Sequence, residues 1–234
     1  MTILAAAQNA IMQLVGSKPA AVVSSTDTIC VEITALAHEA AVDIATAYDW
    51  QKLIKFHTIT GTGTSTAFPF PADYDRMVQA SEIFDPDNWC WGYNHITSPS
   101  DWLFYENNSL GLIPPGIWTV REDQFHFLPV PPAGAKAVFP YITRSIFVDA
   151  NGAPKDQITA DSDSFVLNER LLTLSLIWRY KAMKGLDYQQ DMENFNVAMD
   201  RATANDRGAR QIHRENGPHP MKGIRTAYPW PLDA

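Results

Sequence analysis

The sequence is poor in cysteine and contains no long hydrophobic run. Its 234 residues include two cysteines, Cys30 and Cys90, which cannot build a disulfide framework and lack the spacing of a zinc or redox motif. No apolar stretch reaches the about 18 residues that a membrane-spanning helix needs. Residues 2–16 lack the basic start of a signal peptide and contain polar residues. We therefore expect a soluble, non-exported chain made in a reducing compartment, with no contact to a membrane.

Recognisable catalytic and metal-binding motifs are also missing. His38-Glu39 is not followed by the second histidine of a zinc-protease helix, and residues 61–64 lack the lysine of a phosphate-binding loop. No Gly-x-Ser-x-Gly elbow occurs. The acidic runs at 85–87 and 161–163 supply too few oxygen ligands for a calcium loop, and we expect the second to cap a helix. These absences predict a protein that is not an enzyme, with no catalytic residue, no metal and no cofactor.

The charge is spread unevenly along the chain. There are 18 basic and 26 acidic residues, a net charge of −8. Residues 207–234 hold five basic residues against two acidic ones, which gives +3 and leaves −11 on the preceding 206 residues. A basic, proline-rich tail on an acidic body predicts an extended arm over residues 209–234 that binds a negatively charged partner. The residues expected to contact it are Arg207, Arg210, Arg214, Lys222, Arg225, Tyr228, Trp230 and Leu232.

Hydrophobic spacing predicts helices at both ends of the chain. A helix capped by Thr2 is expected to end at Gly16, and a second one capped by Asp27 carries apolar residues three and four apart. In the last third, a leucine-rich helix is expected to end near Gly185, followed by an acidic helix. We expect these helices to share a core made of Ile33, Ala40, Ile44, Leu171, Leu174, Trp178 and Phe195.

The middle of the chain is of strand type. Runs at 57–60, 117–121, 124–129 and 137–144 are rich in aromatic and β-branched residues and are bounded by turn residues. Glu122-Asp123 predicts a hairpin turn in which Phe125 and Phe127 share one face. Residues 98–102 predict a short helix capped by Ser98, and residues 149–152 a turn.

Together these segments predict an α+β protein, an antiparallel four-helix bundle with a β-rich insertion and an extended C-terminal arm. The expected divisions are an N-terminal helical hairpin (1–56), the insertion (57–157), a C-terminal helical hairpin (158–208) and the arm (209–234).

An aromatic block spans Trp89 to Tyr93, with Trp102 and Tyr105 nearby. Three interpretations remain open for it: filling of a small β-rich core, a protein interface, and a sugar-binding platform. A fourth alternative pairs Cys90 with His95 as nucleophile and base, although proximity in sequence does not establish the geometry.

The stretch 158–208 resembles the C-terminal helical hairpin of bacteriophage head–tail adaptor, or connector, proteins. The most specific match is the run Glu-Arg-Leu-Leu-Thr-Leu through Leu-Ile-Trp-Arg at 169–179, followed by Lys-Gly-Leu-Asp-Tyr at 184–188. The resemblance extends over roughly residues 1–208. Its upstream pieces are 48–50, 70–76, 98–102, 127–132 and 149–152.

The resemblance implies a structural function. Such adaptors are similar to the tail tubular-type proteins of short-tailed phages: they form a ring under the portal vertex, match its twelve-fold symmetry and receive the tail nozzle or tube. The implied partners are the portal protein, neighbouring adaptor subunits and the nozzle or tube protein, with DNA only passing through the ring. The implied location is the virion, after synthesis in the host cytoplasm. The competing hypotheses are a carbohydrate-binding or depolymerising virion protein that uses the aromatic block, and a small hydrolase.

Overall fold

The chain folds into two compact units, and each makes most of its contacts within itself. The computed structural model describes residues 2–86, 92–108 and 116–206. One unit, here called the helical unit, contains the residues up to Ile54 and those from Ile142 onward through the last helix. The other, the sheet unit, contains Lys55–Tyr141. Residues 142–157, expected in the β-rich insertion, thus belong to the helical unit.

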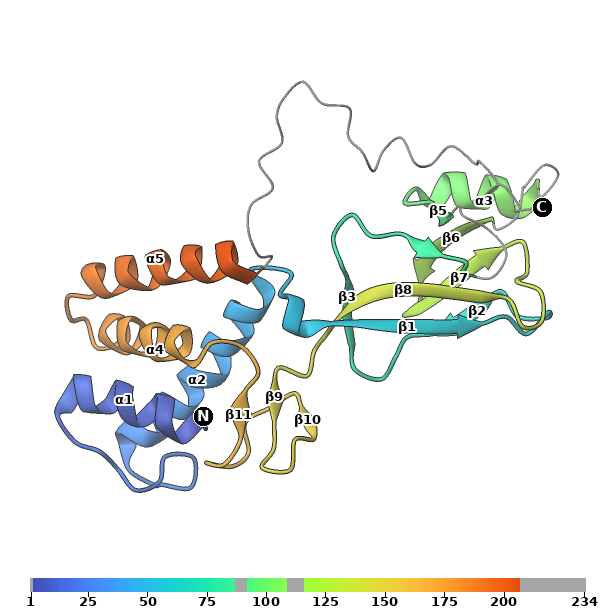
Figure 1. Cartoon of the computed structure of the whole chain (residues 1–234). Helices are drawn as coiled ribbons and strands as arrows, with labels where there is room; N and C mark the ends of the chain where they lie inside the picture. The colour runs from blue at the N-terminus through green and yellow to red at the C-terminus, as the bar shows by residue number, and fades with distance from the viewer. Residues whose placement is uncertain (1, 87–91, 109–115, 207–234) are drawn as a thin grey trace, which may run out of the picture. The chain divides into compact units, whose positions relative to one another are not determined.

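Among the residues described, the helical unit consists of four α-helices, a short 3-10 turn and a small sheet (Figure 1). The three short strands pair in the order β10–β9–β11, both pairs antiparallel. The elements are α1 (Ile3–Val15), α2 (Thr28–Thr46), η1 (Gln51–Leu53), β9 (Phe147–Val148), β10 (Pro154–Lys155), β11 (Ser164–Phe165), α4 (Glu169–Met183) and α5 (Gln189–Asp206).

Helix α4 is the centre of this unit, because it packs against α1, α2 and α5. Helices α1 and α4 run in the same direction (Figure 1). Two contacts fix that register: the Ile3 N–H donates to the Asp163 carbonyl at 2.7 Å, and the Thr173 hydroxyl donates to the Ala6 carbonyl at 3.4 Å. On its other flank, Arg179 pairs with Glu39 of α2 at 3.4 Å.

The predicted antiparallel four-helix bundle is wrong, although the α+β class fits the structure. A bundle requires every helix to bury an apolar stripe in one shared core. Helix α5 has no buried residue, and α1 is parallel to α4. The prediction failed because the Leu171, Leu174 and Trp178 stripe was assigned to a common core, whereas it lies toward α5.

Helix α4 is in fact packed on two opposite faces. Leu172 and Leu176 are fully buried, and at 100° per residue they point away from the stripe that Leu174 and Trp178 form. Leu174 and Trp178 themselves are only partly buried. A helix that is apolar on both sides carries little amphipathic signal, so its two neighbours cannot be distinguished from sequence.

Three predicted helix caps and the predicted end of the first helix are confirmed. Thr2 and Asp27 occupy the N-cap positions of α1 and α2, and Gly16 ends α1 in the left-handed conformation, with φ of 72°. In the sheet unit, Ser98 caps α3 (Pro99–Asn107), and its hydroxyl accepts the Asp101 N–H at 3.3 Å.

The described part of the sheet unit is built on an eight-stranded mixed sheet (Figure 1). Its strand order is β1–β8–β4–β5–β6–β7–β2, with β3 also paired to β8, and β5 and β6 are parallel. The four predicted strands are confirmed as β1, β6, β7 and β8. The bounds are β1 (Ile54–Thr60), β2 (Ala67–Pro69), β3 (Tyr74–Met77), β4 (Ile83–Phe84), β5 (Gly92–His95), β6 (Ile117–Arg121), β7 (Gln124–Leu128) and β8 (Lys136–Thr143).

The core of the sheet unit is aromatic. Phe125, Phe127 and Phe139 are fully buried, and the Phe125 and Phe139 ring centroids lie 4.6 Å apart. The predicted hairpin is confirmed: β6 and β7 pair in antiparallel register from Arg121↔Gln124. Glu122 and Asp123 both have positive φ, 52° and 58°, as the type I′ turns that match strand twist require.

Trp178 tests how α5 is held. Its ring lies 6.3 Å from both the Tyr188 and the Phe195 rings, and its indole N–H is buried without a hydrogen-bond partner. Trp178→Ala is expected to lower the free energy of unfolding by about 2–3 kcal/mol, less than full burial would imply, because the side chain is partly exposed. Urea unfolding of the full chain measures this effect.

Trp178→Phe is the matched control. It keeps an aromatic ring against Phe195 and gives up an N–H that donates to nothing, so we expect a loss below about 1.5 kcal/mol. An alanine variant as stable as the phenylalanine variant would show that this contact does not hold α5.

Candidate protein interface

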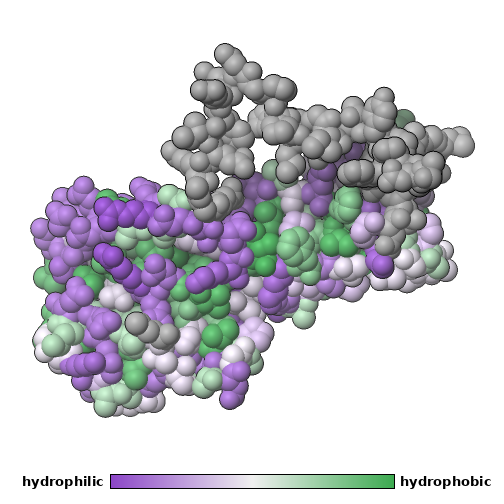
Figure 2. All heavy atoms as spheres, viewed as in Figure 1, coloured by the Kyte–Doolittle hydropathy of each residue, from purple (hydrophilic) through white to green (hydrophobic). Residues whose placement is uncertain are grey.

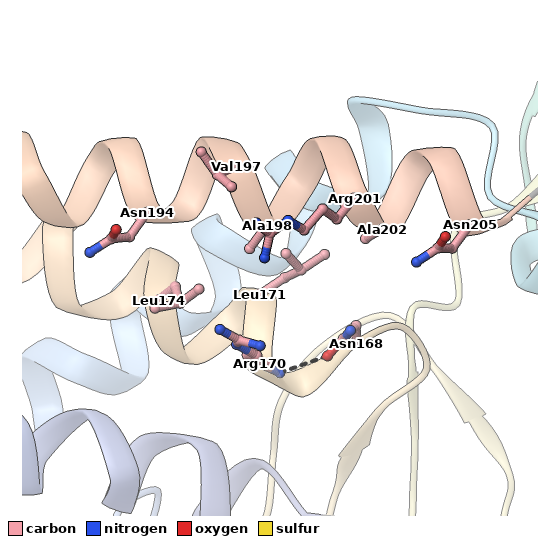
Figure 3. Close-up of a pocket in the computed structure, with 10 residues that line it drawn as sticks. All are labelled: Asn168, Arg170, Leu171, Leu174, Asn194, Val197, Ala198, Arg201, Ala202 and Asn205. Carbon is pink, nitrogen blue, oxygen red and sulfur yellow. Dashed lines mark hydrogen bonds between the residues drawn. The ribbon is translucent and has the colours of Figure 1, made fainter.

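A groove of about 610 Å³ lies between α4 and α5 (Figure 3). Its floor is apolar: Leu171 and Leu174 of α4 lie between the two helices, below Ala198 and Ala202 of α5. Val197 is 43% exposed at its edge. The outer surface of α5 is mainly hydrophilic (Figure 2), and the groove below it combines this apolar floor with a polar rim.

The polar side chains around this floor are amides and arginines. Asn168, Asn194 and Asn205 join Arg170 and Arg201 in the lining. Within the described residues neither arginine makes an ion pair, and both are exposed. The described residues of the helical unit include 15 acidic and nine basic ones, a net charge of −6, so two unpaired arginines at one groove are a local positive site. The groove suits an acidic partner with apolar side chains.

One end of the groove is fixed by hydrogen bonds. Asn168 is the N-cap of α4, and its side-chain oxygen accepts the Arg170 N–H at 2.9 Å. Asn205 lies at the same end (Figure 3), and the Asp206 carboxylate next to it accepts the Gln51 N–H at 2.8 Å, which ties the end of α5 to the segment after α2. The groove is therefore held at the end where α4 begins and α5 ends.

The acidic run at 161–163 does not cap α4, contrary to the expectation from sequence; that position belongs to Asn168. The Asp161 carboxylate instead accepts the Val22 and Val23 N–H groups, both at 2.9 Å. Burial alone would raise the pKa of Asp161, but these bonds and one from Ser24 lower it. Asp161 thus fastens the loop between α1 and α2 to the chain before α4.

Asp163 is 1% exposed and serves a similar purpose. Its carboxylate accepts a charged hydrogen bond from Lys155 at 2.6 Å and the Thr159 and Ala160 N–H groups at 2.8 and 3.0 Å. Burial would raise its pKa, yet the Lys155 ammonium and the two N–H groups lower it. The geometry is that of a structural anchor between β10 and β11.

The aromatic block divides between described and undescribed residues. Trp89, Cys90 and Trp91 lie outside the described residues. Tyr93 is 4% exposed and packs its ring 5.1 Å from Phe127, and burial together with Asp85 raises the pKa of Tyr93 to about 12. Trp102 is 3% exposed. Tyr93 and Trp102 therefore fill the core and offer no open sugar platform.

The remaining chemical candidates are few. Cys30 is a free, buried thiol. His95 stacks on Trp118 with ring centroids 4.1 Å apart, and burial lowers the pKa of His95. Within the ranges that the structure covers, no cluster of three or more histidine, cysteine, aspartate or glutamate side chains is arranged to hold a metal ion. In the same ranges no helix has the length and apolar character to cross a membrane.

The residues expected to form the core separate into two groups. Ile33, Ala40, Ile44 and Leu171 are at most 1% exposed. Leu174, Trp178 and Phe195 are partly buried and lie at the contact between α4 and α5. The expected arm residues lie outside the described residues: Arg207, Arg210, Arg214, Lys222, Arg225, Tyr228, Trp230 and Leu232.

Sequence reasoning missed the groove. Arg170 was noticed only within the leucine-rich run, and Arg201 carried no signal of its own. The available signal was the composition of α5, an 18-residue helix rich in Asn and Asp whose apolar positions are too sparse to bury a face.

Taken together, the described residues present two features at the surface: a groove with an apolar floor and two arginines, and a helix, α5, that is packed on one side only. These are features of a protein that acts through assembly. A comparison with family models identifies it further: the chain belongs to the SU10 adaptor protein family, whose model matches residues 1–222. No curated protein matches the chain. It is therefore a structural adaptor protein of a bacteriophage and a component of the virion, where it contacts other head or tail proteins.

The buried Asp163 gives a prediction for acid stability. Because the folded state lowers its pKa, the carboxylate stabilises the fold at pH values above its ordinary pKa of 3.8, and this contribution is lost as the pH falls through the lowered value. Asp163→Asn is expected to destabilise the protein at pH 7 by about 2–4 kcal/mol, since it leaves Lys155 unpaired. The variant should also show a weaker pH dependence of unfolding between pH 5 and 2 in urea titrations.

Asp156→Asn is the control, because this exposed carboxylate pairs with Arg144 at the surface, and asparagine keeps the oxygen that accepts the Ser145 hydroxyl at 2.9 Å. We expect it to change stability by less than about 1 kcal/mol. Equal effects of the two substitutions would show that Asp163 is not an anchor.

Proposed function

We propose that the chain forms a ring of adaptor subunits between the portal vertex and the tail nozzle or tube of a short-tailed phage. The ring matches the twelve-fold symmetry of the portal, and DNA passes through its lumen during genome ejection. The subunits are made in the host cytoplasm and join the virion at the head–tail interface. The observation that carries this proposal is the family match over residues 1–222.

The charge distribution supports a passage for DNA. The 206 residues before the tail carry −11, so a ring of these bodies presents little positive surface to the phosphate backbone. A lumen that does not bind DNA allows it to move through. The same charge repels free subunits from one another, which favours a monomer in solution that assembles on the portal.

The C-terminal segment is the proposed link to the portal. It carries five basic residues against two acidic ones, and Tyr228, Trp230 and Leu232 supply apolar anchors. The family match ends at residue 222, so these three anchors lie beyond it, whereas Arg210, Arg214 and Lys222 lie within it. The segment thus separates into a basic part shared with the family match and an apolar end outside it.

Assembly can be tested directly. The purified protein is expected to sediment as a monomer at micromolar concentration and to form a second ring when mixed with portal rings, seen by electron microscopy. Rings without portal would contradict assembly on the portal. Portal rings that stay bare would contradict the proposed function.

Two truncations test the arm. Removal of residues 209–234 should leave the thermal midpoint unchanged and abolish portal decoration. Removal of residues 223–234 alone should weaken decoration at least about tenfold, because it takes away three apolar anchors and keeps four of the five basic residues that steer association. Binding by light scattering and differential scanning calorimetry give the two readouts.

The alternative is that the segment lies on the acidic body of its own chain. In that case both truncations lower the thermal midpoint, and any loss of portal binding is a consequence of the lost stability. Full binding by the 209–234 deletion would exclude the arm as the portal contact.

A further inference from the structure

Helix α3 has an exposed apolar surface. Its buried side is anchored by Trp102, whereas Leu103 is 53% and Phe104 61% exposed. A helix that is apolar on both sides is normally covered on both sides. Exposed neighbouring Leu and Phe side chains on a nine-residue helix therefore indicate a contact surface.

Two acidic side chains flank this apolar pair. Asp101 is exposed, and within the described ranges its carboxylate has no ion pair. Glu106 is exposed, and among the residues that the structure describes its one ion pair is a long contact with Arg121, at 3.9 Å. Helix α3 thus presents an apolar centre between two carboxylates.

This surface complements the groove between α4 and α5 in chemistry and in length. The groove has an apolar floor and two arginines, Arg170 and Arg201, that make no ion pair within the described residues, and α3 has an apolar centre and two carboxylates. At 1.5 Å per residue the nine residues of α3 are about 13 Å long, and the groove from Asn194 to Asn205 is about 17 Å long. The helix is therefore shorter than the groove.

We propose that α3 of one subunit docks in the α4–α5 groove of the neighbouring subunit, with Leu103 and Phe104 toward the apolar floor. At 100° per residue Asp101 and Glu106 lie on either side of this pair, where they face the arginines at the rim of the groove. The inference rests on the proposed ring, because it supplies the contact between adjacent subunits. Two different surfaces of the same chain meet, which makes a head-to-tail interface, and interfaces of this type close into rings.

Charge argues for this occupant over two others. The basic C-terminal segment, at +3, is repelled by Arg170 and Arg201. A DNA backbone would be attracted by the arginines, but it offers nothing apolar to the floor that Leu171, Leu174 and Ala202 provide. Helix α3 of a second copy offers carboxylates to the arginines and apolar side chains to the floor of the groove.

Charge reversal on each side tests the interface. The groove variant is Arg170→Glu with Arg201→Glu, and the helix variant is Asp101→Lys with Glu106→Lys. All four side chains are exposed, so both variants should fold, and circular dichroism checks this. The matched control is Lys18→Glu with Lys52→Glu, which changes the net charge as the groove variant does at exposed positions elsewhere.

Sedimentation of the full chain, from micromolar to the highest soluble concentration and without portal, gives the association constant. We expect wild type and control to self-associate weakly at the upper end of this range, and each variant alone to do so at least about tenfold less. An equal mixture of groove and helix variants is expected to recover wild-type association, because each reversed surface then meets a complementary one.

Recovery in the mixture can come only from contacts between chains. No association of wild type or of the mixture, or loss without recovery, overturns the inference. Loss of binding to a DNA duplex in the groove variant alone would assign the groove to DNA and overturn it as well. Because portal is absent, a protein that fails here and still decorates portal leaves the proposed function standing.

Discussion

The helical unit depends on one constraint, the burial of α4 on two opposite faces. Leu172 and Leu176 are packed on the face opposite to the one that Leu174 and Trp178 turn toward α5. Helix α4 lies between α5 and the pair α1 and α2, so α5 does not reach the core that these two helices share with α4. Most of the α5 surface therefore stays exposed. Apart from the hydrogen bond between Asp206 and Gln51 at its end, α5 is packed mainly against α4, and this leaves the groove and its arginines exposed.

Local structure could be predicted from the sequence far better than packing. Caps at Thr2, Asp27 and Ser98 and the turn at Glu122-Asp123 depend on neighbours in the chain, and such signals are visible in one sequence. The arrangement of the helices depends on which face of α4 meets which partner. Because α4 is apolar on two opposite faces, its sequence does not show which face meets which helix, and for this reason the bundle prediction was wrong.

The site was predictable only in part. Family resemblance pointed to an assembly protein, and the family match agrees at the level of a phage adaptor. The basic segment attracted attention because its charge is contiguous, but it lies outside the described residues. Arg170 and Arg201 are 31 positions apart, and α3 lies far from both in sequence. A site assembled from residues that are far apart in the sequence leaves no local sequence pattern, so it can be identified only in the folded structure.

The sheet unit joins the chain through two neighbouring strands. Residues 55–141 enter by β1 and leave by β8, and these strands pair side by side in the sheet. The helical unit, in contrast, closes its own contacts between α1, α2 and α4 without using that segment. An insertion whose entry and exit lie together can be exchanged for another domain with the same spacing. A phage lineage can thus remodel what this protein presents to a new partner while retaining the helices, and the two parts are free to diverge at different rates.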